Sequence, residues 1–134
     1  MVRQLDAPLD LYRRPRSVFV ADFIGSSTIL RGSYSNGHWV VSDLPPLSAP
    51  ANCEGALAIA LRPESVTLLP VDDADCLLRG SVSEVYFQGD HALAQVTVED
   101  TAFLAAVRED VLPERGARVG LSWRESAMIP LVAD

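Results

Sequence analysis

Short hydrophobic runs, most of them alternating with polar residues, make up this chain after residue 26. A period of two residues is typical of strands that bury one face and expose the other. Between residues 101 and 106 the pattern fits either a strand or a short helix. The chain is therefore predicted to be mostly β, as a sandwich or a small, partly open barrel. We expect strands over residues 27–34, 38–42, 56–61, 65–69, 76–88, 91–98, 117–123 and 127–132.

Turn-forming residues separate these runs. Asn36 and Gly37 favour a two-residue hairpin loop, because both tolerate the positive φ angles of such a loop. Several prolines predict a loop over residues 43–54. The alternation of the longest run slips near Gly80, where we expect a β-bulge. Pro130 has no N–H to donate, so the last strand is predicted to lie at a sheet edge.

One stretch near the N-terminus has the pattern of a helix instead. Ser17 can accept a hydrogen bond from an orphan N–H of the first turn, and Gly25 can end the helix. Phe19 and Phe23 are four residues apart and share one face, with Ile24 in a second apolar row beside them. A helix this apolar must be covered on more than one side. We interpret it as a joint between two bodies of structure.

A second short helix is predicted before this joint, within residues 2–14. Pro8 suits a first helical turn, and Pro15 stops the helix. The predicted organisation is a helical lead over residues 1–25, followed by a β-domain over residues 26–134. The predicted fold class is all-β with a short helical N-terminal lead.

Composition indicates a globular chain without a targeting or membrane segment. Of 134 residues, 49% are hydrophobic and 22% are charged. No run approaches the ~20 apolar residues of a membrane helix. The first six residues have no apolar core, so we expect no signal peptide. Cys53 and Cys76 form no CxxC pair and are expected to be free, buried thiols, in keeping with a reducing cytoplasm.

The charge pattern excludes several kinds of chemistry. Formal net charge is −7, and every basic residue other than histidine is an arginine. Without a lysine there is no GxxxxGK[ST] phosphate loop and no lysine Schiff base. The acidic balance opposes a nucleic-acid partner, because neutralising phosphates dominates that affinity. The 7% of aromatic residues are also too few for a base-stacking platform.

No residue combination in the sequence predicts catalysis or a cofactor. His38 and His91 both adjoin predicted turns, and no local motif links them to a nucleophile. The acidic stretch of residues 70–75 lacks the spacing of a calcium loop. We therefore expect no catalytic residue, no metal site and no cofactor.

Several segments, taken in order, resemble motifs of importer-type ABC transporter ATP-binding subunits. The lead has the form Q-x-x-x-P-x-x-[IL]-Y-x-x-P, and FVADFIG is similar to the family's F-V-A-x-F-I-G. Asp6-Ala7 and Ser27 depart from the family, which usually has Gly-Thr and often has asparagine there. The resembling segments are residues 4–15, 19–25, 58–64, 80–89 and 116–119, together with Trp123.

The resemblance implies the C-terminal transport-associated OB-type (TOBE) domain of such a subunit, of the polyamine, ferric-iron or maltose type. The nucleotide-binding motifs are absent from this sequence, so the resemblance implies a domain that is not an enzyme. It implies an OB-like, partly open barrel of antiparallel strands.

The same resemblance implies a regulatory and dimerisation role in solute import, of the polyamine or iron type. The implied partners are a second copy of the domain, an ATPase domain and a permease, but no nucleic acid. The implied location is cytoplasmic, peripheral to the inner membrane, with membrane contact only through the permease. The alternative is a small-molecule or oxyanion sensor that regulates transport.

Two groups of residues are carried over from the family. Arg62, Pro63 and Glu64 match its R-P-E motif, where Arg62 and Glu64 either pin a strand end or contact a ligand; we expect the structural role. A second group forms the linker helix, and its members are Phe19, Phe23, Ile24 and Gly25.

Overall fold

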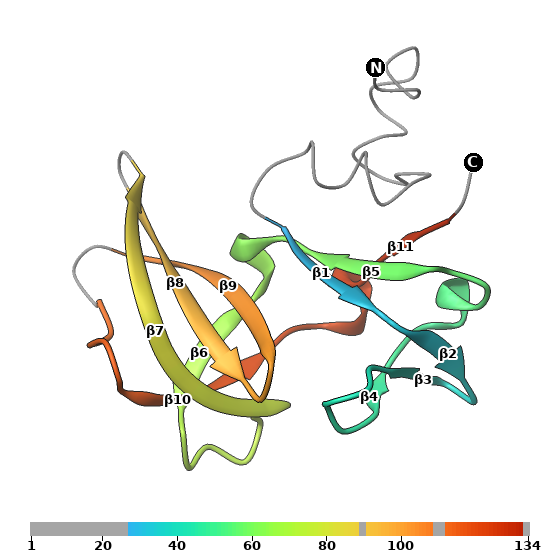
Figure 1. Cartoon of the computed structure of the whole chain (residues 1–134), viewed down its shortest axis with the longest axis horizontal. Coiled ribbons are helices and arrows are strands. Elements are labelled where there is room, and N and C mark those ends of the chain that lie inside the picture. The colour runs from blue at the N-terminus through green and yellow to red at the C-terminus, as the bar shows by residue number, and fades with distance from the viewer. Residues whose placement is uncertain (1–26, 89–90, 109–111, 133–134) are drawn as a thin grey trace. The chain divides into compact units, whose positions relative to one another are not determined.

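The computed structural model describes residues 27–88, 91–108 and 112–132. Within these residues the secondary structure is antiparallel β-strands and short 3-10 turns, which confirms the predicted all-β class (Figure 1). The two predicted N-terminal helices lie outside the described residues. The described part contains no helix long and apolar enough to cross a membrane.

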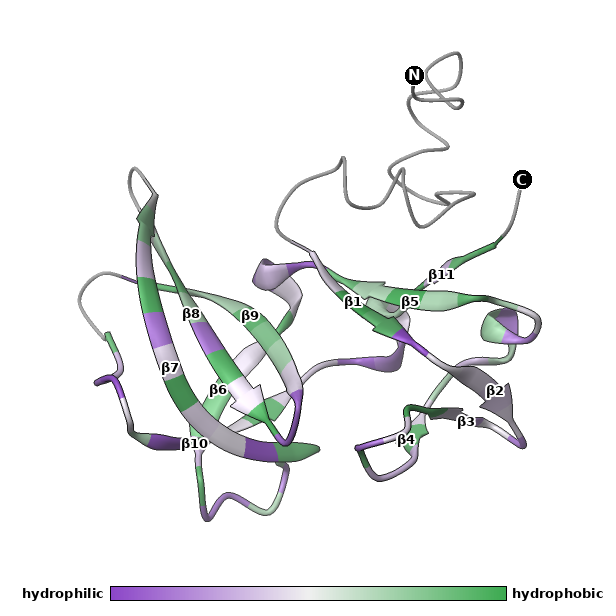
Figure 2. Cartoon of the chain, in the orientation of Figure 1, coloured by the Kyte–Doolittle hydropathy of each residue, from purple (hydrophilic) through white to green (hydrophobic). Residues whose placement is uncertain are grey.

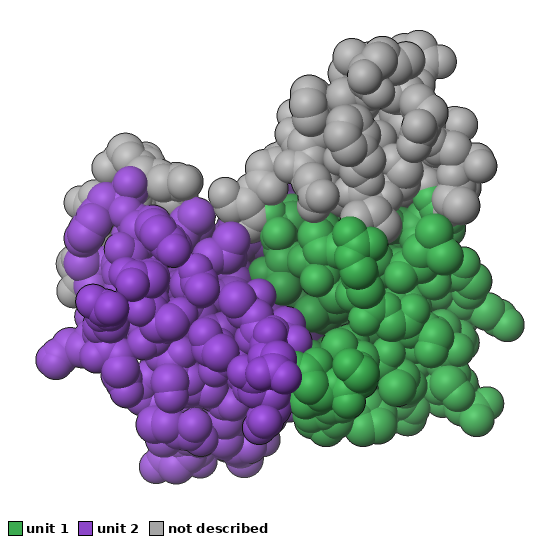
Figure 3. Space-filling model, in the orientation of Figure 1, with its two compact units in different colours: residues 1–61, 125–134 green, residues 62–124 purple. Residues whose placement is uncertain are grey.

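The chain divides into two compact units, coloured separately in Figure 3. Unit 1 comprises residues 1–61 and 125–134, and unit 2 comprises residues 62–124. The described elements of unit 1 are β1 (Thr28–Arg31), β2 (Ser33–Ser35), β3 (His38–Val40), β4 (Leu47–Ser48), η1 (Ala51–Cys53), β5 (Ala58–Leu61), η4 (Glu125–Ala127) and β11 (Ile129–Leu131). Those of unit 2 are η2 (Pro63–Ser65), β6 (Thr67–Pro70), β7 (Leu78–Gln88), β8 (His91–Val98), β9 (Thr101–Val107) and β10 (Arg118–Ser122).

Unit 1 contains two small sheets, ordered β1-β5-β11 and β2-β3-β4. The β2–β3 hairpin turns at Asn36 and Gly37, whose φ angles of 48° and 82° confirm the predicted loop. Trp39 on β3 is fully buried, and its Nε1 donates to the carbonyl of Leu30 on β1 at 3.1 Å. This bond satisfies the indole inside an otherwise apolar core.

The predicted strand over residues 27–34 is divided at Gly32 into β1 and β2, which belong to different sheets. A Cβ on Gly32 would lie 2.1 Å from the carbonyl oxygen of Val40. Glycine therefore allows a backbone approach that any side chain would block. The predicted loop over residues 43–54 also differs, because it contains β4 and η1.

Unit 2 is a five-stranded antiparallel sheet in the order β6-β10-β7-β8-β9. Strands β6 and β9, at the two ends of this order, also contact each other, so the sheet curls towards closure. This arrangement is consistent with an OB-like barrel. Phe103 is fully buried and stacks on Trp123, with ring centroids 5.7 Å apart. In Figure 2, apolar and polar colours alternate along β7, as expected for a strand with one face in this core.

The bulge in β7 lies three residues beyond the predicted position. Pairing with β8 shifts between Val82 and Glu84, which leaves Ser83 as the extra residue. Its hydroxyl donates to the carbonyl of Gln95 at 3.1 Å. Gly80, where the bulge was predicted, instead allows close backbone packing, since its Cβ would lie 2.3 Å from the carbonyl oxygen of Thr97.

The remaining predictions for these elements have clear outcomes. The ambiguous stretch 101–106 belongs to strand β9. Strand β11 lies at the edge of its sheet with Pro130 at its centre, as predicted. Both cysteines are free, but only Cys53 is buried, because Cys76 is partly exposed.

Candidate functional site

The Arg-Pro-Glu motif forms the turn that follows strand β5. Arg62 precedes the 3-10 turn η2, and its carbonyl accepts a hydrogen bond from the Ser65 amide at 2.9 Å. The Pro63 carbonyl accepts from the Val66 amide at 3.2 Å. Pro63 is buried and occupies the first turn, where its fixed φ suits the geometry and its missing N–H is not needed.

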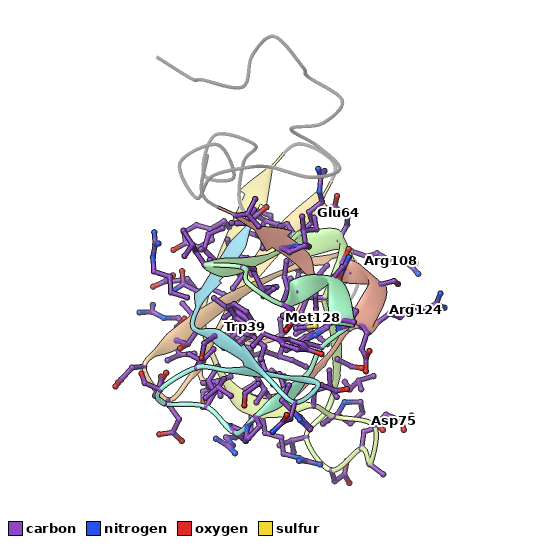
Figure 4. The ribbon with its side chains drawn as sticks, turned by 90° about the vertical axis from the view of Figure 1, so that its right-hand side faces the viewer. Trp39, Glu64, Asp75, Arg108, Arg124 and Met128 are labelled. Carbon is purple, nitrogen blue, oxygen red and sulfur yellow. The ribbon has the colours of Figure 1, made fainter. Side chains whose placement is uncertain are left out.

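The two charged members of the motif differ in exposure. Arg62 is half-buried, whereas Glu64 is exposed and points outward in Figure 4. Within unit 2, η2 packs against strand β9. The turn thus brings the three residues together at the end of β5, and their role in pinning that end stays a prediction. The linker residues Phe19, Phe23, Ile24 and Gly25 lie outside the described residues.

The acidic turn between β6 and β7 is organised by an arginine. Nε of Arg79 donates to the carbonyl of Val71 at 2.7 Å, and its Nη2 donates to the carbonyl of Asp73 at 3.0 Å. The Asp75 amide donates to Oδ1 of Asp73 at 2.8 Å. Across residues 27–88, 91–108 and 112–132, no three His, Cys, Asp or Glu side chains gather as metal ligands would. These contacts make the acidic turn a structural loop.

Cys53 has the surroundings of a structural thiol. It is fully buried in unit 1, and its Sγ lies 3.8 Å from Oδ1 of Asn52. Burial, and secondarily the negative charge of Glu125, raise the pKa of the Cys53 thiol. The thiol therefore stays protonated and is a poor nucleophile. Glu125 also accepts a short hydrogen bond from the Ser48 hydroxyl.

The most exposed large hydrophobic side chains of unit 2 lie at the far end of β7. Phe87 is 67% exposed and Tyr86 is 45% exposed. We call these two residues the β7 aromatic pair. Phe87 is paired with Ala92, a fully buried residue of β8, so its side chain lies on the face that forms the core further along the sheet. The ring of Phe87 therefore lies on the same face as the core residues of the sheet, but beyond the part of that face that is covered.

The other member of the pair belongs to a polar network. The Tyr86 hydroxyl donates to Oε1 of Gln95 at 3.0 Å, and the Thr97 hydroxyl donates to that of Ser83 at 3.2 Å. These bonds span β7 and β8 on the face opposite Phe87. An ion pair between Glu84 and an exposed arginine of the β9–β10 connection adds little, because both groups are solvated. The network fixes the strand end that carries Phe87.

The sequence shows that two aromatic residues are adjacent in β7, but not which part of the strand is exposed. Tyr86 and Phe87 are adjacent in a strand, and adjacent side chains point to opposite faces. The two faces of a curled sheet differ in burial. One of two adjacent aromatic side chains is therefore expected on the less buried face. Alternation alone groups Phe87 with Leu78, Val82 and Val85 as the apolar side of this strand, and it does not show that Phe87 is exposed.

Comparison with known families gives the assignment. The TOBE domain family matches residues 59–131, which is more than half of the 134 residues. The chain belongs to the TOBE domain family. The matched residues include strand β5 except for Ala58, all of unit 2 and strand β11. The resemblance found in the sequence is thereby confirmed for the TOBE domain.

Curated relatives match nearly the whole chain. The spermidine/putrescine import ATP-binding protein PotA of Desulfitobacterium hafniense is 30% identical over 90% of this chain. PotA of Pseudomonas aeruginosa is 34% identical over 94%, and the uncharacterised ABC transporter ATP-binding protein YdcT of Escherichia coli is 28% identical over 99%. The chain spans 34%, 40% and 37% of these three proteins.

A solved structure has a similar fold. The cytoplasmic molybdate-binding protein ModG aligns with a TM-score of 0.59 over 79% of this chain and 92% of the ModG chain. Sequence identity is 14%, so the likeness concerns the fold alone. It supports the all-β fold described above.

Proposed function

We propose that this chain is the C-terminal TOBE domain of an ABC importer ATP-binding protein of the polyamine or iron type. One observation carries the proposal. Relatives named as spermidine/putrescine import ATP-binding proteins align with 90% and 94% of this chain, although the chain spans little more than a third of their length. A chain that aligns along nearly all of its length with about a third of such a protein is best explained as the corresponding part of one.

In this proposal the domain is non-catalytic. It lies in the cytoplasm, pairs with a second copy and follows an ATPase domain, and it contacts the membrane only through a permease. The sequence has no lysine, and a GxxxxGK[ST] phosphate-binding loop needs one. This agrees with a nucleotide site that lies in the ATPase domain and not in this domain. Nucleic acid is not an expected partner, given the net charge of −7.

The pairing surface we assign is the exposed ring of Phe87. It extends the core face of β7 into solvent, and burying a phenylalanine side chain contributes about 1.5–3 kcal/mol. A second copy related by a two-fold axis buries the same ring twice. The alternative function, a small-molecule or oxyanion sensor, has only the fold likeness to ModG in its support.

A chimeric transporter tests the proposal directly. The C-terminal segment of the Pseudomonas aeruginosa relative is replaced by this chain, and uptake of labelled spermidine is measured in a strain that lacks the relative. We expect uptake well above that of the relative truncated before the segment. Uptake no higher than that of the truncated protein, with both proteins present at equal levels, would contradict the proposal.

A further inference from the structure

The far half of β7 has a paired strand on one side and none on the other among the described residues. Strand β10 pairs with the first residues of β7, and the Gly116 amide extends this contact to the carbonyl of Val82. Beyond Val82, the described strand that pairs with β7 is β8. Residues 84–88 therefore form an open sheet edge in the described part of unit 2.

The register decides which backbone groups point out of this edge. Gln88 pairs with His91 across two residues, and such a pair exchanges its hydrogen bonds within the hairpin. Bonded and non-bonded pairs then alternate, so Tyr86 bonds β8, whereas Val85 and Phe87 direct their N–H and C=O groups away from β8. These outward groups have no backbone partner among the described residues.

This edge lacks the features that keep sheet edges from pairing. Proline, charged side chains or a bulge within an edge strand usually prevent the addition of another strand. Strand β11 of unit 1, by contrast, is an edge strand with Pro130 at its centre. Val85, Tyr86 and Phe87 are uncharged, and the bulge of β7 lies before them, at Ser83. The edge can therefore accept another strand.

We propose that a second copy of this chain adds its own β7 to this edge, antiparallel, about a two-fold axis that passes beside Tyr86. The inference rests on the pairing of two copies in the proposed function and specifies how they pair. In this register Val85 of one copy lies opposite Phe87 of the other, and each such pair exchanges both of its hydrogen bonds. An axis at Tyr86 thus satisfies the outward groups of both residues with each other.

The side chains favour the same register. Val85 and Phe87 share one face of β7, so the two copies together form a continuous apolar patch there. The Phe87 ring, 67% exposed in the single chain, gains Val85 of the other copy as its neighbour. On the opposite face Tyr86 lies beside its own copy, and such aromatic pairs stabilise antiparallel strands. Glu84 lies opposite Gln88, so like charges do not meet.

Disulfide formation between two copies tests this register on the full chain. Tyr86→Cys places its two cysteines in a non-hydrogen-bonded pair with Cα atoms about 4.5 Å apart, which a disulfide can span. Glu84→Cys is the matched control on the same face, because its two cysteines would be more than about 13 Å apart. Leu57→Cys, an exposed position in unit 1, controls for random collision. All three variants carry Cys76→Ser, since Cys76 is partly exposed.

The rates of crosslinking are compared at a concentration where sedimentation shows a dimer. We expect Tyr86→Cys to crosslink roughly tenfold faster than either control, because paired cysteines meet at a high effective concentration. Equal rates for Tyr86→Cys and Leu57→Cys, or a faster rate for Glu84→Cys, would overturn the proposed strand pairing.

Hydrogen exchange of the parent chain at low and high concentration gives a second readout. The amides of Val85 and Phe87 should be protected in the dimer and not in the monomer, whereas the Tyr86 amide, bonded within the hairpin, should be protected in both. Protection of Val85 and Phe87 in the monomer, or their fast exchange in the dimer, would overturn strand addition. A dimer that fails these tests leaves the pairing of the proposed function in place, whereas a chain that stays monomeric contradicts both. Uptake by the chimera tests the transport function separately.

Discussion

At the scale of single residues, the close approach of β7 to β8 depends on Gly80. A Cβ there would lie 2.3 Å from the Thr97 carbonyl oxygen and 2.8 Å from Cγ2 of Val98. The first of these atoms belongs to the backbone of β8 and cannot rotate away. We expect Gly80→Ala to force β7 from β8 and to lower the free energy of unfolding by about 1–3 kcal/mol, as overpacking does. Urea denaturation measures this loss.

Gly55→Ala is the matched control. Gly55 has a φ of +82° and open space around its Cα, so its substitution introduces backbone strain of roughly 1 kcal/mol without a clash. Gly80→Ala destabilises through a steric clash, whereas Gly55→Ala destabilises through a strained φ angle. The crystal structures of the two variants should therefore differ as well. A displaced β8 is expected only in Gly80→Ala. Equal stability of Gly80→Ala and the parent protein would show that the strands separate without loss.

At the scale of elements, the β6–β7 turn tests whether an acidic loop is held by an arginine. Arg79→Met keeps the length of the side chain and removes both donors to the carbonyls of Val71 and Asp73. Because Arg79 is exposed, we expect a loss of only about 1 kcal/mol in global stability. Hydrogen exchange of amides 73–76 should accelerate more than exchange elsewhere. The control is Arg118→Met, an exposed arginine on β10, which should leave this turn unchanged.

The elements that the sequence predicted are those that depend on interactions between residues close together in the chain. The Asn36-Gly37 hairpin and the strands of unit 2 were predictable, because φ preferences and alternation act over a few residues. The break at Gly32 and the bulge at Ser83 were not, since each depends on a distant strand that no local pattern reveals. The pairing of β5 with both β1 and β11 joins residues that are far apart in the chain.

At the scale of the whole molecule, the candidate site was predicted in part. The TOBE family was identifiable because its motifs lie in unbroken segments of sequence, such as Arg62-Pro63-Glu64. The exposure of Phe87 was not identifiable, because it depends on where the curl of the five-stranded sheet ends. Alternation distinguishes two faces of a strand but not a covered part of a face from an uncovered one.

Self-association through Phe87 is the prediction that concerns the whole molecule. Two copies related by a two-fold axis each bury one ring that is 67% exposed in the single chain, so truncation removes about 2–4 kcal/mol from the dimer. Phe87→Ser should therefore raise the dimer Kd by roughly 30-fold or more. Leu57→Ser is the matched control, because Leu57 in unit 1 is also exposed, at 53%. Sedimentation equilibrium over a concentration series measures both; a parent chain that stays monomeric throughout, or a dimer that Leu57→Ser weakens and Phe87→Ser does not, would refute this surface.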